Sequence, residues 1–156
     1  TYDGKTKNPS VTVKAGGTTF TEGKSYTVSY ASGRQNVGTY KVTVKMKGNY
    51  SGTKTLTFKI IPVKTTLGTL TAAKKALTVK WTKKSTQVTG YQIQYSTKAD
   101  FSSARRVTIT KKSTYKRTFK NLKRKTVYYV RIRTYKEVDD VKYFSYWSAA
   151  KTVKTK

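Results

Sequence analysis

The sequence predicts an all-β protein made of two small β-sandwich domains in tandem. Apolar residues alternate with polar ones in nearly every apolar stretch, which places one face of a strand on a core and the other in water. Threonine, valine and tyrosine dominate these stretches, as strand propensity favours, and no amphipathic helical pattern competes with them. Glycine-containing turn segments separate the stretches. The 156 residues are enough for two small domains.

The first half of the chain contains four alternating stretches, separated by turns that carry Gly-Gly, Glu-Gly-Lys, Ser-Gly-Arg or Lys-Gly-Asn. The expected strands are Val11–Val13, Tyr26–Tyr30, Tyr40–Met46 and Leu56–Ile60. A boundary is expected at Ile61-Pro62-Val63, because proline has no N–H group for a central ladder. We therefore expect one domain over residues 1–61 and a second over 62–156.

Seven stretches follow Pro62, roughly ten residues apart, which is typical of an immunoglobulin-like sandwich. The expected strands are Leu67–Leu70, Leu77–Trp81, Tyr91–Tyr95, Val107–Ile109, Tyr115–Phe119, Tyr128–Thr134 and Ala149–Val153.

Several motifs of the second half occur together in a known family. Pro62 opens this half, Trp81 ends LTVKW, a later strand reads GYQIQY, and Leu122 precedes Tyr128 by six residues, the spacing of a tyrosine corner. Residues 62–156 thus resemble a fibronectin type III domain. The usual Pro-Gly after the leucine is replaced by Lys-Arg-Lys, and no Arg-Gly-Asp is present, so integrin binding has no sequence support. The expected core residues include Trp81, Tyr91, Leu122 and Tyr128.

The first half carries the segments YDGKTKNPSVTVK, YTVSY, NVGTYKVTVKMKGNYSGT and FKI. With these segments, residues 1–61 resemble the short immunoglobulin-like repeats of Gram-positive bacterial surface proteins. The resemblance implies a further strand before the Tyr-Asp-Gly-Lys segment, so we expect this repeat to lack its first strand. It also implies a secreted or cell-wall-associated parent protein, and therefore an extracellular location.

The charge is strongly and unevenly basic. The chain has 34 Lys and Arg against 6 Asp and Glu, a formal net charge of +28. Residues 1–61 carry 10 basic and 2 acidic side chains, whereas residues 62–156 carry 24 and 4. Solubility requires only a few net charges, so an anionic partner is indicated.

The stretch from Leu122 to Lys136 concentrates this charge. Alternation places Tyr128 and the apolar residues after it inward, and places Arg131 and Arg133 outward with Tyr129 and Tyr135. On this basis, serine in place of Arg131 and Arg133 is expected to leave folding nearly intact. The candidate polyanion-binding residues are Lys123, Arg124, Lys125, Arg131 and Arg133.

Three explanations of the basic charge remain open: binding of anionic cell-wall polymers or host glycans, general charge with no dedicated ligand, and nucleic-acid binding. No helix-turn-helix, zinc-finger or RNA-binding sheet motif is present, and the basic residues are spread over all the strands. Specific nucleic-acid binding is therefore not expected.

The segment KYFSYWS contains a candidate aromatic surface. Alternation puts Trp147 and Tyr146 on opposite faces, so one of them is expected to be exposed. An exposed ring there either forms a carbohydrate-binding platform or packs at the edge of the sheet, with the aliphatic parts of Lys and Arg side chains lying across it.

The residue types argue against catalysis. The chain has no His and no Cys, so the usual nucleophile and base pairs and the commonest metal ligands are missing. Glu137, Asp139 and Asp140 are the only clustered acids. Three acids are too few for calcium alone, and we expect Asp139 and Asp140 in the turn between the last two strands. We predict no catalytic residue, no metal site and no cofactor.

The sequence therefore predicts a non-catalytic extracellular module that acts as a spacer or adhesion element. We expect a monomer whose other contacts are with neighbouring domains of the same chain. The alternative is an accessory module that targets a secreted hydrolase, whose catalytic domain lies outside these residues, to its substrate or to the wall.

Overall fold

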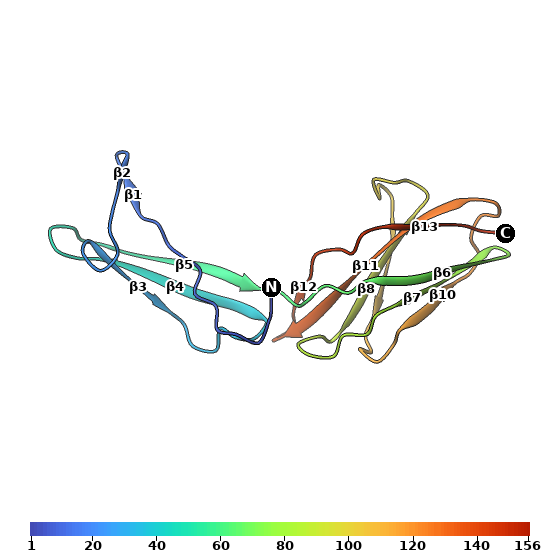
Figure 1. The fold of residues 1–156 in the computed structure, drawn as a ribbon, viewed down its shortest axis with the longest axis horizontal. Helices are drawn as coiled ribbons and strands as arrows, with labels where there is room; N and C mark the ends of the chain where they lie inside the picture. Colours follow the sequence, from blue (N-terminus) through green and yellow to red (C-terminus); the bar gives the residue numbers. More distant parts are fainter. The chain divides into compact units, whose positions relative to one another are not determined.

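The computed structural model describes all of residues 1–156, and it confirms the all-β fold class, since the chain forms strands and no helix. The chain divides into two compact units (Figure 1). Tyr2–Ile60 form one, called here the first unit. Ile61–Lys156, together with Thr1, form the other, called here the second unit.

The first unit is built on a three-stranded antiparallel sheet in the order β3-β4-β5. Its strands are β3 (Tyr26–Tyr30), β4 (Gly38–Met46) and β5 (Thr53–Ile60). The buried side chains of Tyr26, Val42 and Val44 lie on these strands with the predicted alternation. A short separate hairpin is formed by β1 (Lys14–Ala15) and β2 (Thr18–Thr19).

The predicted strand at Val11–Val13 is absent from the sheet. Regular pairing begins only at Lys14, in β1. The segment is instead held by single hydrogen bonds, one from the Tyr26 hydroxyl to the Val11 carbonyl oxygen at 3.0 Å and one from the Phe20 amide to the Val13 carbonyl at 2.9 Å. Alternation predicts which way these side chains point, but it does not show whether a neighbouring strand is present to pair with the segment.

The second unit is a sandwich of two antiparallel sheets. One sheet has the order β10-β7-β6, with strands β6 (Leu67–Ala73), β7 (Ala76–Trp81) and β10 (Lys116–Phe119). The other has the order β12-β11-β8-β9, and β13 also pairs with β11. Its strands are β8 (Gly90–Ser96), β9 (Arg105–Ile109), β11 (Val127–Val138), β12 (Val141–Phe144) and β13 (Lys151–Lys154).

One hydrophobic cluster fills the space between the two sheets. It contains Trp81 and Tyr91, whose ring centroids are 5.4 Å apart, and also Leu122 and Tyr128. The long strand β11 contributes alternate residues to this cluster, as predicted from its pattern. The Tyr91 hydroxyl oxygen is satisfied within the fold, since it accepts a hydrogen bond from the Lys84 amide at 2.8 Å.

The sequence pattern did not predict strand β12. It follows a two-residue turn at Asp139 and Asp140, whose φ angles are 47° and 60°, and Val138 pairs directly with Val141 across it. Two successive positive φ angles define the type I′ turn that favours tight hairpins, and aspartate tolerates this conformation better than most residues. The two acids thus lie in a turn, and they extend β11 into a hairpin.

Candidate functional site

The outer face of β11 carries Arg131 and Arg133 beside two glutamines of β8. Arg131 pairs with Gln94 across the strands, and its Nε donates a hydrogen bond to the Gln94 Oε1 at 2.7 Å. Arg133 pairs with Gln92, and its Nε and Nη2 donate to the Gln92 Oε1 at 3.0 and 2.6 Å. These bonds fix the plane of each guanidinium group.

Aromatic rings enclose both guanidinium groups. The Arg131 group lies 4.0 Å from the ring centre of Phe101 and 4.7 Å from that of Trp147. The Arg133 group lies 4.3 Å from Trp147 and 3.9 Å from Phe144. Trp147 therefore lies between the two cations. The arrangement gives cation–π attraction at both positions, and we call these five residues the arginine–aromatic stack.

The segment that carries Trp147 is fixed to β11 through backbone and serine hydrogen bonds. The Ser145 amide donates to the Thr134 carbonyl at 3.0 Å, and the Ser148 amide donates to the Ile132 carbonyl at 2.8 Å. In return, the Thr134 and Ile132 amides donate to the Oγ atoms of Ser145 and Ser148, both at 3.1 Å. Tyr146, between the two serines, is 72% exposed.

The arginine–aromatic stack changes the expectation for Arg131 and Arg133. Both are only half-exposed, and burial lowers the pKa of each guanidinium from its usual value. An arginine remains protonated under such a shift, so both positive charges persist. Because their N–H groups and faces are already engaged, the contacts now favour a loss of stability when serine replaces either arginine.

Alternation predicted that Tyr135 lies on the exposed face. The structure buries it instead, since the residue is only 1% exposed. It lies opposite Gly90 of β8, and its ring is close to the position that a side chain of Gly90 would occupy. Its ring centre is 5.9 Å from that of Phe144 on β12. The rings of Tyr135 and Phe144 therefore pack together on this end of the sheet, a contact that depends on a strand the sequence pattern did not predict.

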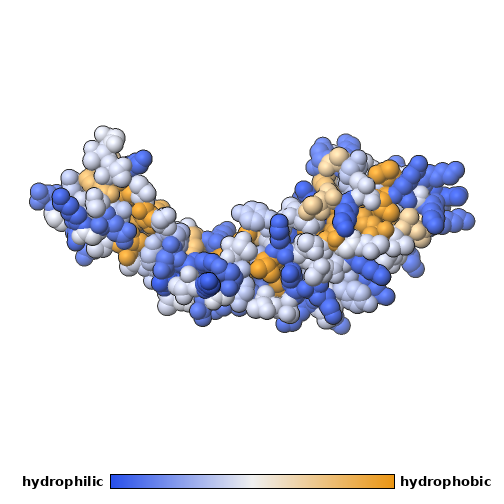
Figure 2. Space-filling model, viewed as in Figure 1, coloured by the Kyte–Doolittle hydropathy of each residue, from blue (hydrophilic) through white to orange (hydrophobic).

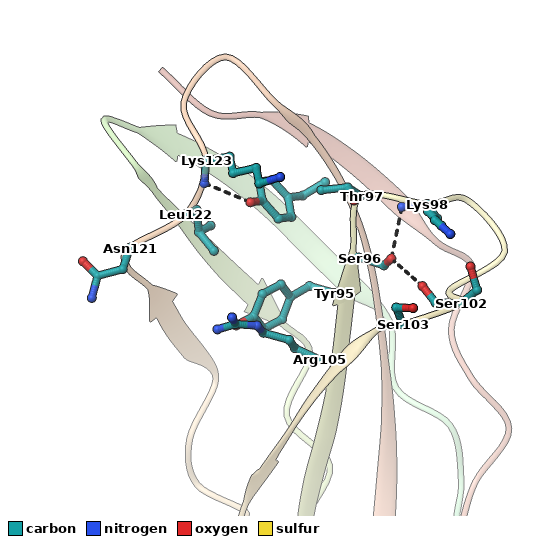
Figure 3. A pocket seen from close by; sticks show the side chains of 11 residues that line it. Tyr95, Ser96, Thr97, Lys98, Ser102, Ser103, Arg105, Asn121, Leu122 and Lys123 are labelled. Carbon is teal, nitrogen blue, oxygen red and sulfur yellow. Dashed lines mark hydrogen bonds between the residues drawn. The ribbon is translucent and has the colours of Figure 1, made fainter.

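A small cavity of about 300 Å³ lies at one end of the second unit. It is bordered by the segment after β8, by the start of β9, and by the turn between β10 and β11 (Figure 3). Three basic side chains line it: Lys98, Arg105 and Lys123. We call this hollow the basic cavity.

The floor of the basic cavity is aromatic and rigid. Tyr95 and Tyr128 are buried, with ring centres 6.3 Å apart, and Tyr95 also packs on Phe119 at 4.6 Å. The Lys123 amide donates a hydrogen bond to the Tyr128 hydroxyl oxygen at 3.0 Å. This is the bond that defines a tyrosine corner, so the backbone of Lys123 is held in place while its side chain stays free.

The predicted basic residues thus separate into two places. Arg131 and Arg133 belong to the arginine–aromatic stack, whereas Lys123 lines the basic cavity with two cations that the sequence did not single out, Lys98 and Arg105. No local motif marks these two residues, because the cavity depends on segments that come together only in the fold. Arg124 and Lys125 are exposed in the same turn but do not line the cavity.

The acids form no metal site. Glu137 pairs with Lys142 at 3.4 Å, and Asp139 and Asp140 occupy the hairpin turn. No group of three or more carboxylate, imidazole or thiol side chains comes together anywhere in the chain. The acids therefore have structural positions in the β11–β12 hairpin.

The two-sheet antiparallel sandwich and its tyrosine corner define the class of immunoglobulin-like β-sandwich modules. The sequence profile of the fibronectin type III domain matches residues 62–143, which is more than half of the chain. The protein belongs to the fibronectin type III family. Domains of this family are typically non-catalytic, extracellular modules of the adhesion or spacer type.

Solved structures show the same fold. The FN1–FN3 domains of chicken CNTN1 are similar over 77% of this chain, with a TM-score of 0.51 and 20% sequence identity. An fn3 domain of human contactin 1 is similar over 63% of this chain and 82% of its own length, with a TM-score of 0.51 and 22% identity. The matched region spans 42% of the chicken chain. At such identities the likeness concerns the fold alone.

A search of curated protein sequences finds no match to this chain. No helix in the structure has the length and apolar character that a membrane crossing requires.

Proposed function

We propose that the chain is a non-catalytic extracellular module of a bacterial cell-surface or secreted protein, which serves as a spacer or adhesion element and associates electrostatically with anionic polymers. The polymers are those of the cell wall or the sulfated glycans of a host. The bacterial origin is supported by the resemblance of residues 1–61 to Gram-positive surface repeats. The extracellular location is supported by the membership in the fibronectin type III family, whose domains are typically extracellular.

The observation that carries the proposal is the almost complete lack of internal charge neutralisation. Only two ion pairs form, Lys7 with Asp3 and Lys142 with Glu137. The remaining 32 of 34 basic side chains have no carboxylate partner within ion-pair distance. Figure 2 shows hydrophilic side chains over much of the visible face of the second unit. A surface of this kind attracts any dense polyanion and repels copies of itself.

Attraction of this type depends on counterion release and is weakened steeply by salt. We therefore expect the chain to bind anionic polymers of several chemistries. The affinity should depend on the charge density of the polymer rather than on the sequence of its monomers.

The test is retention of the 156-residue chain on immobilised heparin, on immobilised poly(glycerol phosphate) and on neutral dextran. We expect retention on both anionic matrices at about 0.15 M salt, where surface charges are screened beyond about 8 Å, and none on dextran. Elution should require higher salt on both anionic matrices. Passage through both of them without retention would contradict the proposal.

A further inference from the structure

We infer that the basic cavity is a binding site for a single sulfate or phosphate ester group carried by a polyhydroxylated polymer. The inference rests on the proposed function, because it names the place where the general attraction becomes a defined contact. It concerns Arg105 and Lys123 as the anion-binding residues, with Lys98 at the rim.

Three cationic side chains border the basic cavity. Figure 3 shows Arg105 beside the Tyr95 ring, the side chain of Lys123 toward the other end of the cavity, and Lys98 pointing outward at its edge. None of the three takes part in either ion pair of the chain. No carboxylate lies within ion-pair distance of any of the three, so an oxyanion in the hollow is attracted by all of them.

Asp100, the acid of the neighbouring loop, is already engaged in hydrogen bonds of its own. The Asp100 Oδ1 accepts hydrogen bonds from the amide and the hydroxyl of Ser102, both at 2.8 Å. These bonds lower the pKa of Asp100, so its carboxylate is ionised and orders the loop. It is not a lining residue of the cavity, and the lining contains no acid that would repel an anion.

Hydrogen bonds within the fold already hold the walls of the basic cavity in position. The Ser96 hydroxyl accepts a hydrogen bond from the Lys98 amide at 3.0 Å and donates one to the Ser102 carbonyl at 3.2 Å. The opposite wall is fixed by the bond between the Lys123 amide and Tyr128. A preformed site loses less conformational entropy on binding than a flexible loop does.

The chemistry and the size of the hollow determine the ligand class. Guanidinium and ammonium groups together suit a tetrahedral oxyanion, which offers several acceptor oxygens. The side chains of Thr97, Ser103 and Asn121 also line the cavity and offer partners for neighbouring sugar or glycerol hydroxyls. A volume of about 300 Å³ is at the lower limit of small-ligand sites, so the cavity fits one esterified unit of a polymer.

The test uses the ¹⁵N-labelled 156-residue chain, observed by NMR at constant ionic strength. Two probes distinguish the sources of the anion: glucosamine 6-sulfate for sulfated glycans and glycerol 3-phosphate for phosphate-containing wall polymers. Glucose and sodium chloride serve as uncharged and simple-salt references. We expect at least one probe to produce saturable amide shifts confined to residues 96–105 and 121–123.

The site variant is Arg105→Gln with Lys123→Gln, which removes two charges but keeps the Lys123 backbone amide. The matched control is Arg117→Gln with Lys80→Gln, which removes one Arg and one Lys from exposed positions of the other sheet. We expect the site variant to weaken probe binding by on the order of tenfold or more. The control should bind the probes as the unaltered chain does.

The outcomes separate this inference from the proposed function. Retention on heparin or poly(glycerol phosphate), with probe shifts that are absent, do not saturate or are equal in both double variants, would overturn the cavity assignment alone. Loss of retention on both matrices would remove the proposed function. Saturable shifts that only the site variant loses would support both.

Discussion

Gly90 lies directly opposite Tyr135 in the pairing of β8 with β11, and the Tyr135 ring occupies the space beside the missing side chain. A Cβ atom built on Gly90 would be 2.0 Å from the Ile109 carbonyl oxygen and 2.9 Å from the Tyr135 Cε1. The first of these neighbours is backbone of β9 and cannot rotate away. The position therefore tolerates only glycine.

Substitution Gly90→Ala should destabilise the second unit by about 3 kcal/mol, because the β9 backbone must move as well as the Tyr135 ring. Urea denaturation followed by tryptophan fluorescence measures the change. Gly68→Ala is the control: its nearest neighbour would be the Lys80 carbonyl at 3.4 Å, an ordinary contact. Equal stability of the two variants would show that the close approach at Gly90 is absent.

The tyrosine corner gives a second prediction. Tyr128→Phe removes the hydroxyl that accepts from the Lys123 amide, and we expect a loss of about 1 kcal/mol of unfolding free energy, the usual net contribution of one hydrogen bond. Tyr115→Phe, at an exposed position, should change stability by much less. A Tyr128→Phe protein as stable as the unaltered chain would contradict a structural role for the hydroxyl.

The arginine–aromatic stack predicts that arginine and lysine are not equivalent at position 131. Arg131→Lys keeps the charge but loses the planar group that packs between Phe101 and Trp147 and donates to Gln94. We expect a loss of about 1 kcal/mol in stability and no loss of heparin retention. Arg106→Lys, on the exposed surface of β9, is the control. Reduced retention with unchanged stability would instead assign Arg131 to the polyanion surface.

The hairpin turn offers a stabilising change. Asn at 139 and Gly at 140 suit the two positive φ angles better than aspartate does, so Asp139→Asn with Asp140→Gly should raise the unfolding free energy by about 0.5 to 1 kcal/mol. Alanine at both positions should have the opposite effect, because alanine avoids this backbone region. Thermal unfolding of the two double variants, compared with the unaltered chain, checks the sign.

Alternation predicted the fold well where a strand has partners on both sides. It identified the inward residues of β11, including Tyr128, Val130 and Ile132, because a strand within a sandwich exposes its two faces to different surroundings. It was wrong at Val11–Val13, where no neighbouring strand pairs with the segment, and at Tyr135, whose ring is buried beside Gly90 and Phe144. Alternation predicts which face of a strand a side chain points to, but it does not predict which other parts of the chain pack on that face.

Less of the candidate site than of the fold could be predicted from the sequence. Lys123 could be placed in a turn from its spacing to Tyr128, but the meeting of that turn with Lys98 and Arg105 depends on segments about twenty residues apart in the sequence. The engagement of Arg131 and Arg133 depends likewise on Trp147 crossing back over β11. Both features are long-range contacts, which local periodicity does not encode.

The serine-bonded segment that carries Trp147 also affects edge-to-edge association between copies of the protein. Along one side of β11, β12 pairs with residues 135–138, Ser145 and Ser148 bond to Thr134 and Ile132, and β13 pairs with residues 127–130. The whole border of the longest strand is therefore occupied, and another chain finds no free backbone groups there to extend the sheet. The outer strands of this sheet are β9 on one side, where Arg105 and Arg106 repel a like neighbour, and the short strands β12 and β13 on the other. Short or positively charged outer strands of this kind disfavour edge-to-edge pairing of this sheet with a copy of itself.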